Sequence, residues 1–335
     1  MEKLMRLGKL SPHELERLVF PFQGAEREEV VFGPRLGRDC GVLRLSPLYL
    51  SCTCDPVTGT SFGAGSLAPH LVANDLIASG AEPVALVVSL LFPPEASVSL
   101  LEETMRELDE AAKAIGFAIL GGHTEITDAV TRPVIHCTGI GIIAFEPLPD
   151  VTRVKPGDTI VMTKGAGIEG TAILALERAK ELQGILTDEE LKRAQTFLKR
   201  VSVLPEGRIA LRCSPHCLHD ATEGGILGAV FEVCSAQGLG FILEEGKVLL
   251  FPETEKIARY FGCDPLRLIS SGTLLVFTPH PLPLLGALQD AGIPASVIGQ
   301  VTENGRVLIR KDGTREEVTE CPQDELWRLL EVSKP

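Results

Sequence analysis

The sequence has no run of Lys and Arg, and acidic residues outnumber basic ones: 45 Asp and Glu against 32 Lys and Arg, a formal net charge of −13 at pH 7. A basic stripe lets a protein follow a phosphate backbone, so we expect no nucleic-acid partner. The longest apolar stretches, such as residues 84–92, are far shorter than the roughly 20 residues that a membrane span needs. The N-terminus also lacks the apolar core of a signal peptide. The composition therefore predicts a soluble, cytoplasmic protein without a membrane partner.

Cysteine is present but does not form the pattern of a disulfide framework. The nine Cys residues are an odd number scattered over the chain, which fits reduced thiols better than paired ones. The densest group of potential metal ligands imitates half of a zinc site and contains Cys213, His216, Cys217 and His219. The second pair of ligands that would complete tetrahedral coordination is missing. We therefore expect neither structural disulfides nor a zinc site.

Length and composition predict a globular protein of two domains. With 44% hydrophobic and 23% charged residues, the chain can bury cores of ordinary size. Its 335 residues exceed what one core usually holds. The stretch 146–158 contains three Pro and few apolar residues, which is typical of a connection between domains. We place the boundary there, with domains at residues 1–150 and 151–335.

Periodicity predicts an α/β fold in both halves. Ser11, Pro12 and Glu14 form a capping box with Pro at the first helical position, so a helix is expected to begin there. A second helix is expected from about Ser99 to Gly116, where apolar residues recur at helical spacing. Further helices are predicted at residues 69–79, 171–182, 188–200 and 226–237. Strands are predicted at 49–53, 84–92, 117–120, 134–143, 159–163, 241–243, 273–277 and 296–300, with a hairpin turn at Asn304 and Gly305.

Three aspartates stand where packing alone would not place them. Asp39 belongs to a Gly-containing loop, residues 33–41, that also holds two Arg; this pattern suits a phosphate-binding loop or an ordinary surface turn. Asp55 follows an apolar strand, a position typical of both functional sites and turns. Asp75 lies in an apolar helix, where an unpaired charge is costly if buried. A metal ion or a charged ligand would explain Asp75, and so would an exposed helix face.

Two further segments combine glycine with reactive side chains. The paired Gly121 and Gly122 let the backbone approach a ligand. His123 and Glu125 follow them as a base and a hard oxygen ligand. The segment 219–225 precedes a predicted helix and offers backbone N–H groups, a hydroxyl and two carboxylates. It favours an anion such as phosphate, although Asp and Thr also cap helices well.

Gly165, Gly167 and Gly170 match the G-x-G-x-x-G pattern of dinucleotide-binding proteins. They follow a predicted strand and open a predicted helix. The pattern then requires a parallel strand, yet residues 188–200 have helical periodicity and no strand ending in a ribose-binding acid follows. We therefore expect no nicotinamide or flavin site here.

Six segments, taken in order, resemble the AIR synthase-related, or PurM/HypE-like, superfamily. It includes aminoimidazole ribonucleotide synthetase, the hydrogenase maturation factor HypE, selenophosphate synthetase and thiamine-monophosphate kinase. The segments are Gly37–Gly41, Thr53–Pro56, Val72–Ala81, Gly121–Glu125, His219–Gly225 and Ser271–Thr273. The resemblance implies a two-domain α/β (α+β) PurM-like fold. Its N-terminal ferredoxin-like sheet would form a barrel across a homodimer, and an α/β domain would follow.

The resemblance also implies ATP and Mg²⁺ as cofactors. The metal ligands that it implies are Asp39, Asp55 and Asp75, hard oxygen donors of the kind that Mg²⁺ prefers. The residues implied to bind the nucleotide are Gly37, Asn74, Gly121, Gly122, Thr124, Thr222, Gly224 and Gly225. The implied catalytic residues are His123, Glu125, Asp220 and Glu223. Because many relatives have an acid at the position of His123, the number of Mg²⁺ ions stays open.

The chemistry that the resemblance implies is ATP-dependent activation of an amide or carbonyl oxygen by phosphoryl transfer. The motifs look most similar to HypE, which implies hydrogenase maturation, a small-molecule or protein-bound carboxamide substrate and a maturation-factor partner. HypE relatives carry the carboxamide on a C-terminal Cys, whereas residues 330–335 contain none, so we do not expect a substrate carried on this tail. Two alternatives stay open. One is a nucleotide-binding maturation or scaffold protein without turnover, and the other is a purine-pathway synthetase.

Overall fold

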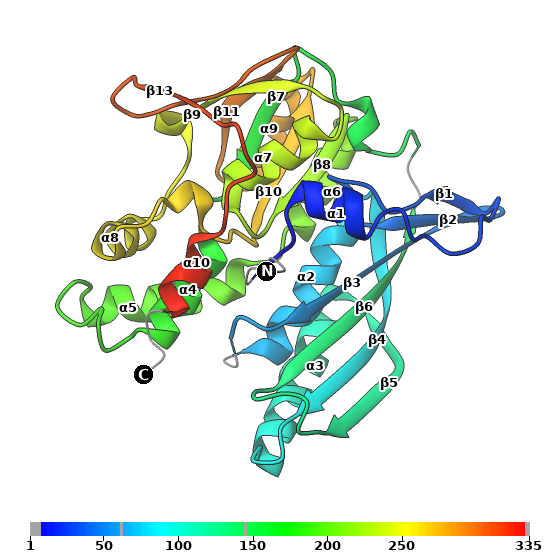
Figure 1. The fold of residues 1–335 in the computed structure, drawn as a ribbon, viewed down its shortest axis with the longest axis vertical. Helices are drawn as coiled ribbons and strands as arrows, with labels where there is room; N and C mark the ends of the chain where they lie inside the picture. Colours follow the sequence, from blue (N-terminus) through cyan, green and yellow to red (C-terminus); the bar gives the residue numbers. More distant parts are fainter. Residues whose placement is uncertain (1–7, 61–62, 144–145, 332–335) are drawn as a thin grey trace, which may run out of the picture.

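The computed structural model describes residues 8–60, 63–143 and 146–331, and these residues form two α/β units, each built on its own sheet (Figure 1). The first sheet has six strands and the second has seven. The predicted boundary at 146–158 falls between the last strand of the first sheet and the first strand of the second. Within the described residues, no helix has both the length and the apolar character needed to cross a membrane.

The first sheet has the strand order β1-β2-β3-β6-β4-β5. Its strands are β1 (Val30–Phe32), β2 (Gly41–Leu45), β3 (Leu48–Val57), β4 (Ala81–Phe92), β5 (Ala118–Ile126) and β6 (Val134–Ile143). Only β4 and β5 pair in parallel; the other neighbours are antiparallel. In β6 the side chains alternate between buried and half-buried, so one face of the sheet is covered and the other is not.

Two helices complete the first unit, with α2 (Ala64–Ala78) against the covered face and α3 (Val98–Ile115) packed on α2. The predicted end of α3 is confirmed, since Gly116 adopts the left-handed conformation there. α1 (Pro12–Leu18) begins with the predicted capping box at Ser11. The predicted start of α2 at residue 69 is wrong: the helix begins five residues earlier and contains Pro69.

The second sheet has the strand order β13-β12-β9-β11-β7-β10-β8. Its strands are β7 (Thr159–Thr163), β8 (Cys217–Ala221), β9 (Gly240–Glu244), β10 (Thr273–Thr278), β11 (Ala295–Thr302), β12 (Arg306–Ile309) and β13 (Arg315–Glu317). The predicted hairpin at Asn304 and Gly305 is wrong. β11 and β12 do not pair with each other, because β9 lies between them and pairs in parallel with β12.

The helices of the second unit are α4 (Ile168–Glu177), α5 (Asp188–Gln195), α6 (Leu204–Arg212), α7 (Gly225–Ser235), α8 (Pro252–Phe261), α9 (Pro281–Asp290) and α10 (Glu325–Glu331). The single helix predicted at 188–200 is instead α5 followed by a 3₁₀ turn, Thr196–Arg200. β7, which precedes α4, pairs antiparallel with both of its neighbours. The glycines 165–170 therefore do not belong to a parallel dinucleotide-binding unit, as expected.

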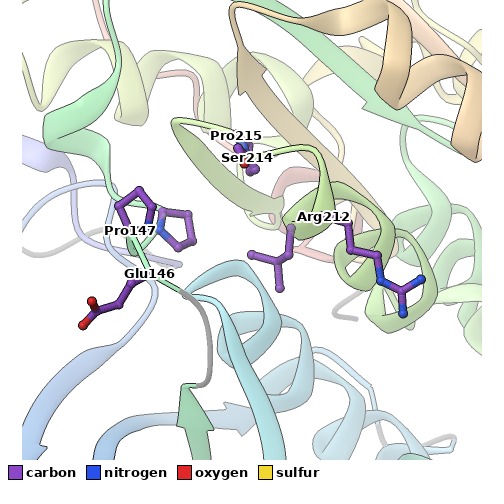
Figure 2. A pocket seen from close by; sticks show the side chains of 7 residues that line it. Glu146, Pro147, Arg212, Ser214 and Pro215 are labelled. Carbon is purple, nitrogen blue, oxygen red and sulfur yellow. The ribbon is translucent and has the colours of Figure 1, made fainter.

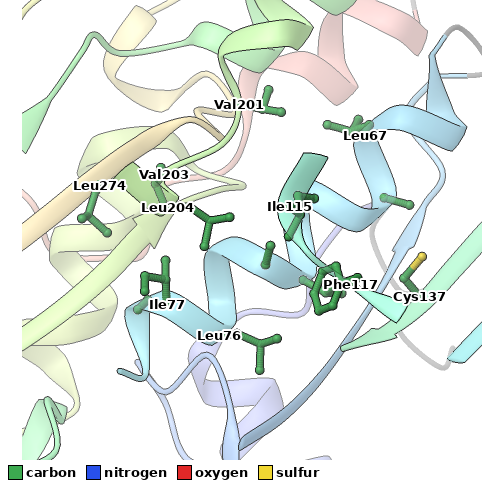
Figure 3. Packing of buried hydrophobic residues seen from close by; sticks show 14 of the residues in the cluster. Leu67, Leu76, Ile77, Ile115, Phe117, Cys137, Val201, Val203, Leu204 and Leu274 are labelled. Atoms are coloured by element: carbon green, nitrogen blue, oxygen red, sulfur yellow. The ribbon is translucent and has the colours of Figure 1, made fainter. Parts of the chain in front are cut away.

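The two units share one hydrophobic core centred on α2 (Figure 3). Leu76 and Ile77 of α2 lie in the same cluster as Val203 and Leu204 of the second unit. Ile77 packs so closely on α6 that a Cβ added at Gly207 would lie 2.6 Å from its Cγ1 atom. α2 is therefore buried on nearly all sides, and its polar residues lie between the two units.

Candidate functional site

Three aspartates from distant parts of the chain converge at the junction of the two units. Asp39 comes from the β1–β2 connection, Asp75 from α2 and Asp220 from β8. One carboxylate oxygen of each lies within 4.8 Å of the others, and among the described residues this is the group suited to hold a metal ion. Asp75 is thus buried beside two other carboxylates, which do not compensate its charge.

The electrostatics of this group favour a bound cation. Burial and the charges of Asp55 and then Asp220 raise the pKa of Asp75 well above its usual value. Burial and the nearby Asp39 likewise raise the pKa of Asp220 to about 7. The Thr53 hydroxyl donates a hydrogen bond of 2.6 Å to Asp75, whereas Oδ2 of Asp220 is buried and has no hydrogen-bond partner among the described residues. A divalent cation would satisfy that oxygen and remove the repulsion between the carboxylates.

Asp55 lies at the edge of this group, near the end of β3. Its charge acts on Asp75 and its own pKa is raised, chiefly by burial. Asp55 is not one of the three residues whose oxygens meet at one point. The structure therefore brings together two of the predicted metal ligands and one predicted catalytic residue, Asp220, with Asp55 beside them.

Asp39 is the first of a row of side chains of alternating charge, which continues through His219 and Glu232 to Lys9. Nδ1 of His219 lies 2.7 Å from Oδ1 of Asp39, and Nε2 lies 3.6 Å from Glu232. The ammonium of Lys9 lies 3.1 Å from Glu232. Burial alone would lower the pKa of His219, but Asp39 and Glu232 outweigh it and raise the pKa to about 10. His219 is thus an imidazolium at neutral pH.

The predicted absence of zinc agrees with this role, because His219 faces Asp39 and His216 faces Asp158, 2.8 Å away.

The loop between β8 and α7 is held by both ends of the chain. The carboxylate of Glu223 accepts hydrogen bonds from the backbone N–H of Lys9, 2.9 Å, and from the indole of Trp327, 3.0 Å. The backbone N–H of Gly224 donates to Asp324, 2.7 Å. The predicted catalytic Glu223 and the predicted phosphate-binding Gly224 are therefore engaged within the chain. Asp324 thus binds Gly224, the residue that precedes α7, and neither Asp220 nor Thr222 caps this helix with its side chain, so the helix-cap alternative for this segment is wrong.

Two of the predicted glycines have steric roles. A Cβ at Gly225 would lie 2.5 Å from the carbonyl oxygen of Leu266, so this glycine lets α7 begin against that segment. A Cβ at Gly37 would meet Val151 and the backbone of α7, 3.0–3.5 Å away. Thr222, the remaining predicted nucleotide contact of the β8–α7 loop, accepts backbone hydrogen bonds from Gly225 and Ser270 through its carbonyl. These contacts fix the loop next to the three aspartates.

The predicted residues of β5 lie apart from the aspartates. All nine residues of this edge strand are exposed, including Gly121, Gly122 and Thr124. Nε2 of His123 lies 3.3 Å from Glu125, with both side chains more than half exposed. Gly122 lies so close to β4 that an added Cβ would be 1.7 Å from the carbonyl oxygen of Val88. Within one chain this segment forms no site with Asp39, Asp75 and Asp220.

Asn74 has a different place from the one predicted. Its side chain is fully buried, donates to the carbonyl oxygen of Val201 at 2.8 Å and accepts from the N–H of Val203 at 2.9 Å. Both polar atoms of the amide are used between the two units. Asn74 therefore positions α2, and with it Asp75, instead of presenting its amide to a ligand.

Sequence reasoning missed the residues that surround the β8–α7 loop. Lys9, Glu169, Asp324 and Trp327 were not predicted as site residues. Only Glu169 carries a local signal, since a carboxylate among the apolar residues of α4 is as unexpected as Asp75 in α2.

Elsewhere, a cavity of about 230 Å³ lies at the junction of the units between Pro147 and Arg212, and none of the three aspartates lines it (Figure 2).

Curated relatives of this chain include proteins of hydrogenase maturation. The chain is 26% identical over 252 residues to the carbamoyl dehydratase HypE of Cupriavidus necator, which covers 73% of this chain and 70% of that protein. It is also 26% identical over 270 residues to a putative hydrogenase expression/formation protein of Methanocaldococcus jannaschii, covering 77% and 76%. The match thus spans most of each relative.

Solved structures share the fold. E. coli HypE has a TM-score of 0.73 at 24% identity, covering 93% of this chain and 96% of that one. The thiamine monophosphate kinase ThiL of Aquifex aeolicus, solved with AMPPCP and TMP, has a TM-score of 0.75 at 18% identity, covering 96% and 99%. A HypE structure in complex with ATP has a TM-score of 0.68 at 22% identity, covering 96% and 97%. The PurM-like fold is confirmed.

The two sheets correspond to two family domains. Residues 37–143 match the N-terminal domain of AIR synthase related proteins, and residues 155–311 match their C-terminal domain. Together these matches include all three converging aspartates. The chain therefore belongs to the AIR synthase related protein family, as its motifs predict.

Proposed function

We propose that this chain is an ATP-dependent enzyme that activates an amide or carbonyl oxygen by phosphoryl transfer, in the maturation of a hydrogenase. The observation that carries the proposal is the convergence of Asp39, Asp75 and Asp220 within 4.8 Å. The curated relatives named carbamoyl dehydratase HypE, and the relative solved with ATP, support this chemistry. The acceptor that fits it is a carboxamide, either free or carried by a partner protein.

Mg²⁺ suits the donor set, which consists of carboxylates and includes Oδ2 of Asp220, an oxygen with no hydrogen-bond partner in the part of the chain that the structure describes. Asp39, Asp75 and Asp220 would hold it, with Asp55 beside them. When bound, the metal neutralises phosphate charge. Nδ1 of His219 lies 2.7 Å from Oδ1 of Asp39, and the Thr53 hydroxyl fixes one oxygen of Asp75. These contacts pre-orient the carboxylates, so little reorganisation is needed on binding.

We also propose a homodimer, with β5 at the interface. β5 is an exposed edge strand that presents the large apolar side chains of Ile119, Leu120 and Ile126 to solvent. Unprotected apolar edge strands favour pairing with another chain. A second copy there would close the sheet into the barrel of the PurM-like fold. The residues of β5 with predicted roles would then act at the interface. They are Gly121, Gly122, His123, Thr124 and Glu125.

Calorimetry of ATP binding with and without Mg²⁺ tests the proposal. The wild-type protein is expected to bind ATP more tightly with Mg²⁺, and Asp75→Asn to lose that difference. Asp109→Asn is the matched control, because Asp109 is an exposed aspartate of α3 that pairs with Lys113. Equal affinities in all of these titrations would rule the metal assignment out.

One observation favours a second candidate, a nucleotide-binding scaffold without turnover. Glu223 and the N–H of Gly224 are occupied by Lys9, Trp327 and Asp324, so these groups are already engaged in the chain. ATP binding without release of ADP, across carboxamide acceptors, would support the scaffold. ADP release that depends on an acceptor would support the enzyme.

A further inference from the structure

Lys9 contacts both carboxylate oxygens of a buried glutamate that is 223 positions away in the sequence. Its ammonium nitrogen lies 3.1 Å from Oε1 and 3.2 Å from Oε2 of Glu232. The Glu232 side chain is only 8% exposed, and the other buried residues of its helix, α7, are uncharged. Burial raises the pKa of Glu232, but Lys9 and then His219 outweigh it and lower the pKa to about 2. Lys9 is therefore the nearest counter-charge of Glu232.

Two basic side chains divide two carboxylates between them. Nδ1 of His219 lies 2.7 Å from Oδ1 and 2.9 Å from Oδ2 of Asp39. Nε2 of the same ring lies 3.6 Å from Glu232, which is longer than a hydrogen bond. The imidazole is therefore bonded to Asp39, and the ammonium of Lys9 is bonded to Glu232.

This division depends on Lys9. Among the described residues, the ion pairs of Glu232 are those with Lys9 and His219. If the ammonium is removed, the imidazole is the charge left to compensate Glu232, and it is only 3.6 Å away. A buried carboxylate without a counter-charge is costly, so the ring is expected to move toward Glu232. That movement lengthens or breaks its contact with Asp39.

The backbone of Lys9 is held in place independently of its side chain. The N–H of Lys9 donates to Glu223 at 2.9 Å. The preceding Gly8 has a φ of +96°, and a Cβ there would lie 2.8 Å from the indole of Trp327. On the other side, Ser11 begins α1 with a capping box. Substitutions that change only the end of the Lys9 side chain therefore test the ion pair and leave these anchors intact.

The row ends at a proposed metal ligand. One oxygen of Asp39 lies within 4.8 Å of oxygens of Asp75 and Asp220. Groups that hydrogen-bond to a metal ligand orient it, and their loss typically weakens metal affinity roughly 10- to 100-fold. His219 is such a group for Asp39, and the ammonium of Lys9 determines where the imidazole lies.

We propose that Lys9 is a positioning residue of the metal site: by taking both oxygens of Glu232, it leaves the imidazole of His219 to Asp39. The inference rests on the proposed function and adds a form of control to the same site, because a residue near the N-terminus sets the metal affinity. Lys9 acts through two other side chains and is not itself a metal ligand.

The first test is Mg²⁺ binding, measured by calorimetry on the full chain saturated with a non-hydrolysable ATP analogue. Lys9→Met keeps the length of the side chain and removes its charge, and it is expected to bind Mg²⁺ about tenfold more weakly. Loss of a positive charge by itself would attract Mg²⁺ more strongly, so weaker binding identifies a loss of positioning. Lys9→Arg should stay close to the wild type, because a guanidinium also contacts both oxygens of a carboxylate.

The matched control is Lys256→Met. Lys256 is 43% exposed, against 44% for Lys9, and its ammonium lies 2.6 Å from Glu190 on another helix. Its substitution removes an ion pair of the same kind away from the aspartates and should leave Mg²⁺ affinity unchanged.

A double variant tests the competition for His219 directly. Glu232→Gln removes the charge that would attract the imidazole, so Lys9→Met combined with Glu232→Gln should recover most of the Mg²⁺ affinity that Lys9→Met loses. NMR of the full chain with ¹⁵N-labelled His supplies a second readout without metal. The signals of the His219 ring, assigned with His219→Gln, should shift in Lys9→Met and return toward their wild-type positions in Lys9→Arg and in the double variant.

Three results would overturn the inference: equal or tighter Mg²⁺ binding by Lys9→Met, His219 ring signals that are the same in Lys9→Met and the wild type, or a double variant that recovers neither. Failure of the proposed function has a different signature, namely loss of Mg²⁺-dependent nucleotide binding in the wild-type protein. The NMR measurement still reports on Lys9 and His219 in that case.

Discussion

His219 and Asp39 are 180 positions apart in the sequence, yet the imidazole nitrogen and the carboxylate oxygen lie 2.7 Å apart in the folded chain. The pair joins the second sheet to the loop that supplies the first aspartate of the candidate site. Both side chains are largely buried, so the two charges compensate each other away from water. The contact therefore fixes a proposed metal ligand of the first unit to the second unit.

The first prediction concerns stability and pH. The pKa of His219 is about 10 in the folded chain against an ordinary value of 6.5. A raised pKa means that the stabilisation is complete below about pH 6.5 and is lost as the pH rises toward 10. The free energy of unfolding should fall by up to roughly 1.4 kcal/mol per pH unit in this window. Urea unfolding of wild type and His219→Gln measures it, and an equally steep fall in both proteins would contradict the assignment.

The second prediction concerns competition between protons and Mg²⁺. The pKa of Asp220 is about 7, because the group is buried close to Asp39. A metal ligand must lose its proton, so Mg²⁺ affinity should be about tenfold weaker at pH 6 than at pH 8. Calorimetry in buffers of different ionisation enthalpy should also detect proton release on binding. Asp220→Asn should reduce both effects without abolishing them, because the pKa of Asp75 is also raised. An affinity independent of pH in wild type would count against Asp220 as a ligand.

The third prediction concerns the only Trp in the sequence. Trp327→Phe keeps an aromatic ring but removes the N–H that donates to Glu223. The free energy of unfolding should fall by about 1 kcal/mol, the usual contribution of one such hydrogen bond. Chemical denaturation measures the change, with Phe22→Leu as a control on an exposed aromatic residue. An unchanged midpoint for Trp327→Phe would show that the contact to Glu223 does not hold α10.

The fourth prediction concerns the exposed edge of the first sheet. Gly122→Ala places a Cβ 1.7 Å from the carbonyl oxygen of Val88, so β5 must move away from β4. The melting temperature and the fraction of dimer should both fall. The comparison is Gly286→Ala, at an open position in α9, which should stabilise the chain by up to about 1 kcal/mol. Thermal unfolding measures the stability of the two variants, and light scattering measures their fraction of dimer. A Gly122→Ala variant that melts and dimerises like the wild type would refute the close pairing of β4 with β5.

The predictions from sequence succeed where the signal is local. The capping box at Ser11 and the glycine at position 116 each fix a helix end through contacts within a few residues, and both are confirmed. The start of α2 is hidden because Pro69, which usually marks a first turn, lies inside that helix. The pairing of β12 with β9 is equally hidden, since Asn304 and Gly305 form a turn without forming a hairpin.

The residues of the candidate site also divide into those that the sequence could identify and those that only the folded chain reveals. Asp75 could be singled out as a carboxylate in an apolar helix, whereas Asp39 was assigned to a metal and Asp220 to catalysis through the family resemblance. Lys9 could not be singled out, because its partner Glu232 is 223 positions away; Glu232 itself carries the signal, as a carboxylate among the apolar residues of α7. Asn74 was assigned to the nucleotide through the family motif, and only the folded chain shows that its amide holds the backbone of Val201 and Val203.

The amide of Asn74 has a mechanical consequence. Its two hydrogen bonds join the first unit to the second inside a shared apolar core, where water cannot replace them. A hinge motion that opens the chain between its sheets would break these bonds and expose α2. The Asn74 contact therefore keeps the two units, and with them the aspartates that each unit contributes, in a fixed relative position.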